Sequence, residues 1–118
     1  MFRGHRDLKV FQLAYRLAME IFHLSKNFPR EEVYSLTDQI RRSSRSVAAN
    51  IAEGLRKRRY PNMLISKLTD CDGEATETQL WLDFALDCGY MCQENHDRLT
   101  AGYEEVGRML SGMIANPR

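Results

Sequence analysis

One segment of this chain repeats small and apolar residues at alternating intervals of four and three positions, the spacing of a helix that buries one face. These positions hold Leu64, Leu68, Cys71, Ala75, Thr78, Leu82 and Ala85. The mean step of about 3.5 residues is close to the ~3.6 residues of one α-helical turn, so the side chains form one stripe. Trp81, Phe84 and Cys88 form a second, adjacent stripe. This helix is therefore expected to contact more than one neighbour, in its own bundle or in another subunit.

Helical periodicity extends over most of the sequence. The apolar spacing and the breaks at Pro29, Pro61, Gly89 and Pro117 predict four helices, at about 6–28, 36–57, 61–88 and 93–115. No segment alternates with the period of a β-strand. Four helices of similar length joined by short loops predict an all-α fold, an antiparallel up-down-up-down four-helix bundle formed by a single domain, 1–118.

The composition, 43% hydrophobic and 28% charged, is typical of a globular protein. No apolar run reaches the roughly 18 residues of a membrane span, and the N-terminal segment lacks the apolar stretch of a signal peptide. A cytoplasmic location without membrane contact is therefore expected. The three cysteines, an odd number without an export signal, are expected to be reduced and partly buried thiols rather than a disulfide framework.

The charges are unevenly distributed although the formal net charge is only +1. Seven Lys or Arg residues and one acid lie between positions 41 and 59, whereas eight Asp or Glu residues and no Lys or Arg lie between positions 68 and 97. Such polarity indicates either an anionic partner at the basic segment or complementary surfaces between helices or subunits.

The basic residues of the second helix fall on one side of it. On a regular helix Arg41, Arg45, Arg56 and Arg59 lie within about 60° of one another, facing away from the apolar stripe. Arg58 would point back toward that stripe, so the helix is expected to fray or turn after 54–56. Arginines at helical spacing contact successive phosphates. The candidate nucleic-acid-binding residues are Arg41, Arg42, Arg45, Arg56, Lys57 and Arg59. The alternative is that this ridge pairs with the acidic face of the third helix, in its own chain or in an adjacent subunit.

Small residues between positions 43 and 54 allow close approach of a neighbouring helix, and Gly102, Gly107 and Gly112 are expected to do the same in the fourth helix. Asn50 and Glu53 are expected to form a hydrogen-bonding latch to the next helix or subunit. Neither has a histidine nearby, and no nucleophile motif or phosphate-binding loop is present, so we expect no catalytic residues and no enzymatic activity.

Cys88, Cys92 and His96 are four residues apart, a spacing that would align three metal ligands on an unbroken helix. Zinc usually requires a fourth ligand, and Gly89 and Tyr90 are expected to interrupt the helix. Packing in a loop or in the core is therefore favoured over a metal site, and no cofactor is expected.

Several motifs resemble one protein family over nearly the whole chain. They are Arg6-Asp7-Leu8-Lys9-Val10, Phe28-Pro29, Tyr34-Ser35-Leu36-Thr37, Gln39-Ile40-Arg41-Arg42, Ser46-Val47-Ala48-Ala49-Asn50-Ile51-Ala52-Glu53-Gly54, then Gly73, Glu77 and Gly89-Tyr90. The specific part is Asn50-Ile51-Ala52-Glu53-Gly54. The chain resembles the bacterial four helix bundle protein family, whose founding members are encoded in intervening sequences of 23S ribosomal RNA genes and which is also labelled S23 ribosomal protein.

This resemblance implies a left-handed four-helix bundle that assembles as a barrel-like homopentamer. The related accessory proteins of diversity-generating retroelements share that form and resemble nucleic-acid-binding partners of a reverse transcriptase. The ribosomal branch of the family has no established activity. Family members usually carry Ser-Leu after the residue that matches Gly73, whereas this chain carries Glu74-Ala75.

Three functions follow from the sequence. The first is a non-enzymatic homopentamer that binds RNA or single-stranded DNA through the basic ridge of the second helix. The second is a structural or protein-interaction scaffold that binds no nucleic acid and docks another protein. The third, the least favoured, is an enzyme with its site at a subunit interface around Asn50 and Glu53.

Overall fold

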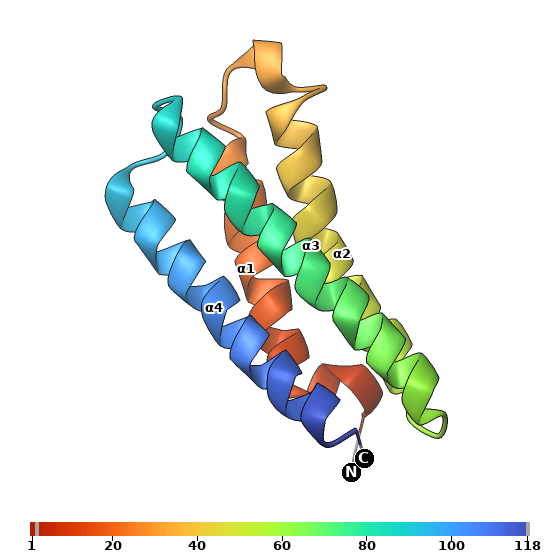
Figure 1. The fold of residues 1–118 in the computed structure, drawn as a ribbon. Coiled ribbons are helices and arrows are strands. Elements are labelled where there is room, and N and C mark those ends of the chain that lie inside the picture. The colour runs from red at the N-terminus through yellow and green to blue at the C-terminus, as the bar shows by residue number, and fades with distance from the viewer. Residues whose placement is uncertain (2, 118) are drawn as a thin grey trace.

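Four α-helices make up most of the computed structural model, which describes Met1 and residues 3–117. They are α1 (Lys9–Ser25), α2 (Leu36–Leu55), α3 (Pro61–Asp87) and α4 (Gln93–Ala115), with short 3-10 turns η1 (Gly4–Asp7) and η2 (Arg30–Glu32). The helices run alternately up and down, and α4 returns beside α1 (Figure 1). The described residues contain no strand, so the all-α prediction is confirmed. The α2–α3 turn and both ends of the described chain lie at one end of the bundle, and η2 lies at the other (Figure 1).

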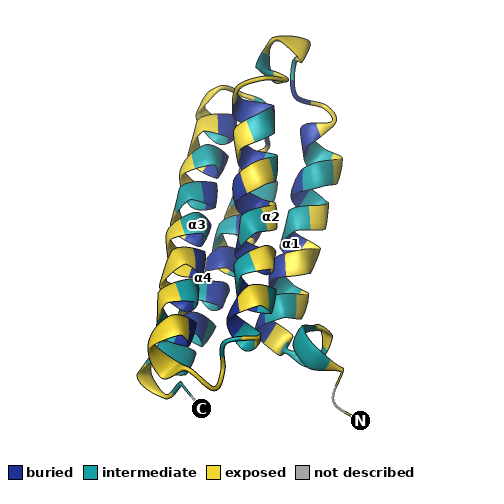
Figure 2. Ribbon diagram, turned by 90° about the vertical axis from the view of Figure 1, so that its right-hand side faces the viewer, coloured by how far each residue is buried: buried dark blue, intermediate teal, exposed yellow. Residues whose placement is uncertain are grey.

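The core contains the whole stripe that the spacing on α3 predicts. Each of its residues is at most 5% exposed, and the buried faces of the helices point inward (Figure 2). A fully buried leucine such as Leu68 stabilises the fold by about 2 kcal/mol relative to an exposed one. Two polar contacts also join α3 to α2: the Thr78 hydroxyl lies 2.8 Å from Ser43 Oγ, and Cys71 Sγ donates to the Val47 carbonyl at 3.2 Å. The pairing of α2 with α3 is therefore fixed by both shape and hydrogen bonds.

The first helix is shorter at both ends than the predicted 6–28. Gly4 has a positive φ of 75°, and the chain forms the η1 turn before an extended Leu8 starts α1 at Lys9. At the other end α1 stops at Ser25, whose hydroxyl donates to the Phe22 carbonyl at 3.0 Å, and a turn follows in which the Phe28 amide donates to the Ser25 carbonyl at 3.1 Å. Pro29 lies in the extended region, so the chain leaves the helical path before reaching it.

The second and third helices also end earlier than the predicted positions 57 and 88. The α2 helix stops at Leu55, and residues 56–59 form the turn that the direction of Arg58 predicts. The α3 helix stops at Asp87, because Gly89 takes a φ of 79° that favours glycine and reverses the chain. The fourth helix occupies Gln93–Ala115.

Two glycines let helices approach closely. A Cβ atom built on Gly54 of α2 would lie 3.4 Å from Lys67 Cβ of α3, and one built on Gly102 of α4 would lie 2.5 Å from Leu17 Cδ2 of α1. The expectation for Gly102 is therefore confirmed. The expectation for Gly112 is wrong, because a Cβ there would meet no atom within 4 Å, and at Gly107 the nearest atom is Asp72 Oδ1 at 3.7 Å.

No helix in the described part of the chain is long and apolar enough to cross a membrane. The longest, α3, has 27 residues and carries six carboxylates.

The two glycines of α4 give a matched test of the packing. Gly102→Ala should lower the free energy of unfolding by about 1–3 kcal/mol, because the new methyl group overlaps the buried Leu17 side chain. Gly112→Ala should raise it by about 0.5–1 kcal/mol, because alanine favours the helix and the added methyl group meets open space. Chemical denaturation of both variants measures the difference, and equal effects would contradict the packing of α4 on α1.

Candidate nucleic-acid interface

Arg41 is held against α1 by two contacts. Its Nε donates to Ser25 Oγ at 2.7 Å, and its guanidinium carbon lies 5.0 Å from the centre of the Phe22 ring. The side chain is half-buried as a result, unlike a residue on a ridge that faces wholly away from the core. A planar guanidinium stacked on an aromatic face keeps its edge donors in a fixed direction. Arg41 is thus oriented before any ligand arrives.

Two more cations surround the same ring. Lys26 Nζ lies 4.7 Å and the guanidinium carbon of Arg45 lies 5.8 Å from the Phe22 centroid. The electron-rich ring attracts all three cations, which offsets part of their mutual repulsion. We call Lys26, Arg41 and Arg45 the upper basic cluster.

The remaining arginines of the predicted ridge lie at the other end of α2. Residues 56–59 form a turn, so their side chains no longer follow the helical register. Arg58 Nη1 donates to the Leu55 carbonyl at 3.3 Å, which also accepts from the Arg58 amide at 3.2 Å, so the Arg58 side chain is held at the helix end. Arg56 and Arg59 are exposed, Lys57 is half-buried, and Arg56 is about 22 Å along the helix axis from Arg41. The predicted ridge is therefore divided into the upper basic cluster and a lower basic cluster of Arg56, Lys57 and Arg59.

Arg42 points toward a different neighbour from Arg41. It forms a 3.9 Å ion pair with Asp38 and lines a groove of about 610 Å³ between α2 and α3. Arg45 lines the same groove, opposite Glu74 and Glu77 of α3. Partial burial, together with the negative charge of Glu77, raises the pKa of Glu74, the residue that departs from the family pattern. This groove contains cations and acids in equal number and is poorly suited to a polyanion.

The predicted pairing of the ridge with acids of its own third helix is not present. Within residues 3–117, Arg41, Arg45, Arg56 and Arg59 form no ion pair with an acid. The ion pair between α2 and α3 has the opposite polarity, with Lys67 Nζ of α3 2.7 Å from Glu53 Oε1 of α2. The charge of both basic clusters is therefore available to a ligand.

The residues 50–54 serve packing, as expected from the sequence. Ile51 is buried, Ala52 is half-buried, and Gly54 admits the side chains of α3. Glu53 forms the predicted latch to the next helix through Lys67, and this hydrogen bond raises the pKa of the lysine. Asn50 instead stays within its own helix, where its Nδ2 donates to Ser46 Oγ at 3.2 Å.

Comparisons with known proteins bear on both the sequence motifs and the helical fold. A sequence profile described as 23S rRNA-intervening sequence protein matches residues 6–112. The chain belongs to this family. A crystal structure of a protein of unknown function from the S23 ribosomal protein family of Bacteroides thetaiotaomicron VPI-5482 matches with a TM-score of 0.81 and 27% identity, covering 91% of this chain and 96% of that chain. No curated protein matches. The resemblance predicted from the sequence motifs is therefore confirmed.

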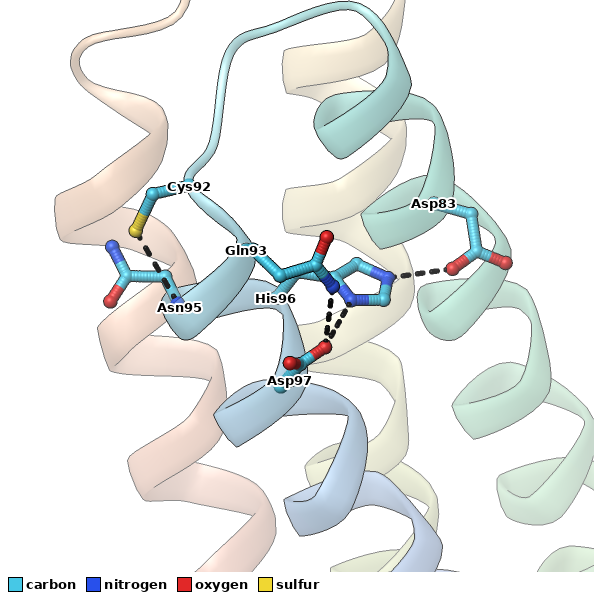
Figure 3. A network of polar contacts seen from close by, with 6 residues as sticks. All are labelled: Asp83, Cys92, Gln93, Asn95, His96 and Asp97. Carbon is cyan, nitrogen blue, oxygen red and sulfur yellow. Dashed lines mark hydrogen bonds and ion pairs between the residues drawn. The ribbon is translucent and has the colours of Figure 1, made fainter.

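The cysteines of this member of the 23S rRNA-intervening sequence protein family are all free. Cys71 is buried, which raises the pKa of its thiol to about 12 and keeps it protonated. Cys88 and Cys92 are both exposed, contrary to the expectation of partial burial. Cys92 precedes α4, and its Sγ accepts a hydrogen bond from the Asn95 amide at 3.4 Å (Figure 3).

His96 lies between two carboxylates instead of joining the cysteines (Figure 3). Its Nε2 is 2.7 Å from Asp83 Oδ1 of α3, and its Nδ1 is 3.3 Å from Asp97 Oδ1. The hydrogen bond to Asp83 is the main cause that raises the pKa of His96. The described residues contain no group of three or more His, Cys, Asp or Glu side chains that could hold a metal ion.

Phe22, Ser25 and Lys26 belong to the basic surface but are not among the site residues predicted from the sequence. A signal was nonetheless present, because Phe22 and Lys26 are four residues apart and so lie on one face of a helix. The contact between Ser25 and Arg41 has no such local signal, since it joins two helices.

The position of His96 predicts that stability depends on pH. Because its pKa is raised in the folded protein, protonation stabilises the fold fully below the unfolded pKa of about 6.5, and this contribution is lost as the pH rises through the folded value. The loss of unfolding free energy in His96→Gln should therefore be larger at about pH 5.5 than at about pH 8.5. Urea denaturation at both pH values measures it. His23→Gln is the matched control, because His23 is exposed and pairs with no described carboxylate. A loss independent of pH would show that the ion pair with Asp83 contributes nothing.

Proposed function

We propose that this protein is a cytoplasmic, non-enzymatic oligomer that binds RNA or single-stranded DNA through phosphate contacts of its two basic clusters. The observation that carries the proposal is that Arg41, Arg45, Arg56 and Arg59 form no ion pair with an acid within residues 3–117. Guanidinium groups that no carboxylate occupies suit phosphate oxygens. Contacts to phosphate carry little sequence information, so the binding is expected to be general and salt-dependent.

A homopentamer would repeat both clusters around a ring, which supports the same proposal. Five copies of a weak phosphate-binding surface give a higher combined affinity when one nucleic acid spans several of them. The second stripe of α3 supports assembly, because Phe84 is 49% exposed and lines one groove with Trp81 and with Tyr34, which is 94% exposed. Leu80, one turn before Phe84 on α3, is 48% exposed. Exposed apolar side chains gathered in one place are typical of surfaces that another protein covers.

The same apolar side chains favour a second candidate function, a scaffold that docks another protein and binds no nucleic acid. The groove lined by Tyr34, Trp81 and Phe84 has a volume of about 340 Å³. Aromatic residues in such a position are common at protein interfaces. The two candidates differ in whether the basic clusters contact phosphate.

Nucleic-acid binding is tested by fluorescence polarisation with a structured RNA and a single-stranded DNA. Wild-type affinity should fall by at least tenfold between about 50 and 200 mM salt, and Arg41→Glu with Arg45→Glu should weaken binding by about tenfold or more at the lower salt. Arg56→Glu with Arg59→Glu tests the lower basic cluster. Both side chains are exposed, so these substitutions leave the core intact.

Lys9→Glu with Arg16→Glu is the matched control, because it makes the same change in net charge at exposed positions of α1. This control should lose no more than a few-fold in affinity, since long-range charge alone acts weakly through salt. The absence of binding at low salt, or equal losses in all three double variants, would falsify binding through the basic clusters and favour the scaffold.

Assembly is tested by light scattering. The wild-type particle should have a mass near five times that of the 13.7 kDa chain. Leu80→Glu with Phe84→Glu should yield monomers of unchanged helical content, because both side chains are half-exposed in the single bundle and a buried charge disrupts an interface. Met63→Glu, a change at another exposed apolar position of α3, is the control. A monomeric wild-type protein contradicts the pentamer.

A further inference from the structure

A pocket at the end of the bundle that carries η2 contains a concentration of positive charge. It has a volume of about 370 Å³ and lies between the end of α1, the η2 turn and the first turns of α2. Lys26, Arg30 and Arg41 line it, and none of the described residues that line it is acidic. In this respect it differs from the α2–α3 groove, where Glu74 and Glu77 oppose the arginines.

The acids next in sequence to the lining residues do not line the pocket. Glu32 accepts hydrogen bonds from the Ser35 hydroxyl, the Leu36 amide and the Tyr90 hydroxyl, which together lower the pKa of Glu32. Asp38 faces Arg42 at 3.9 Å. Glu31 is exposed on η2 and does not line the pocket. No carboxylate therefore neutralises the three cations from within the pocket.

The pocket also offers hydrogen-bond donors in a fixed arrangement. Arg41 uses its Nε on Ser25 and stacks on Phe22, and its terminal nitrogens have no hydrogen-bond partner among residues 3–117. Thr37 is only 5% exposed and lines the pocket, yet its hydroxyl makes no hydrogen bond to a described residue. A hydroxyl that is open to the pocket can donate a hydrogen bond to a ligand oxygen there. Phe28 and Pro29 form an apolar wall that lowers the local dielectric and strengthens charge interactions.

We propose that this pocket binds a phosphate group. Lys26, Arg30 and Arg41 neutralise its charge, and the Thr37 hydroxyl donates to one of its oxygens. A phosphate carries up to two negative charges and several acceptor oxygens, which matches three cations and an unpaired hydroxyl. The proposal rests on the proposed function only for the source of the phosphate, which is either nucleic acid or a small phosphate-containing molecule.

The test follows the arginine side-chain and backbone amide resonances of the full chain by nuclear magnetic resonance during titration with inorganic phosphate, while sodium chloride keeps the ionic strength constant. Saturable shifts should appear at Arg41 Nε and at the amides of Lys26, Arg30 and Thr37. Arg41→Gln and Arg30→Gln should each weaken phosphate binding by about tenfold, the usual loss when one charged hydrogen bond is removed. Arg30 is exposed, so its variant keeps the test valid if Arg41→Gln fails to fold.

Arg16→Gln is the matched control, because it removes the same charge at an exposed position of α1 that lies outside both basic clusters and does not line this pocket. It should bind inorganic phosphate as the wild type does. Shifts that do not saturate, or that survive both Arg41→Gln and Arg30→Gln, overturn the proposal.

An oligonucleotide arm separates this inference from the proposed function. If inorganic phosphate binds and neither RNA nor single-stranded DNA does, phosphate binding in the pocket is supported and the proposed function fails. The ligand of the pocket is then a small phosphate-containing molecule. In the opposite case inorganic phosphate causes no saturable shift, oligonucleotides bind, and Arg30→Gln leaves their affinity and its salt dependence unchanged. Phosphate binding in the pocket is then contradicted, and the proposed function stands. Loss of oligonucleotide affinity in Arg30→Gln, with Arg16→Gln less affected, places a nucleic-acid phosphate in the pocket.

Discussion

The packing of α3 along α2 determines where the charged groups of this bundle lie. One side of α2 packs against α3 through the Thr78–Ser43 contact, the Cys71–Val47 hydrogen bond and the close approach that Gly54 allows. Since successive side chains on a helix are about 100° apart, this packing directs Arg42 toward α3 and Arg41 toward α1. Two neighbouring arginines thereby enter opposite electrostatic environments, one facing Glu74 and one facing Phe22.

The aromatic ring of Phe22 offsets part of the repulsion among the closely spaced cations around it. Three cations within 6 Å of one centroid would repel one another strongly in an apolar setting. The ring offers each a favourable contact of about 0.5–1 kcal/mol, and two of the three remain open to water. A hydroxyl acceptor at Ser25 then fixes the direction of one guanidinium. The arrangement thus holds positive charge in place without a carboxylate, which a site for anions requires.

The sequence predicts the fold well because periodicity reports burial directly. The alternating spacing on α3 identifies a stripe that is entirely buried, and the angular argument about Arg58 identifies the end of α2. The single ridge from Arg41 to Arg59 is not present, because α2 ends at Leu55 and angular spacing does not reveal which neighbour lies on each side of a helix. The contacts of Arg41 with Ser25 and of His96 with Asp83 join different helices, and no local pattern encodes them.

Both ends of the described chain lie at the same end of the bundle as the α2–α3 turn, and the phosphate pocket lies beside η2 at the opposite end (Figure 1). A fused domain or an affinity tag at either terminus therefore emerges at the end of the bundle that carries the lower basic cluster and far from the upper one. Attachment of the protein to a surface through a terminus would present the η2 end outward. The up-and-down course of the chain has in this way made the two clusters separately accessible.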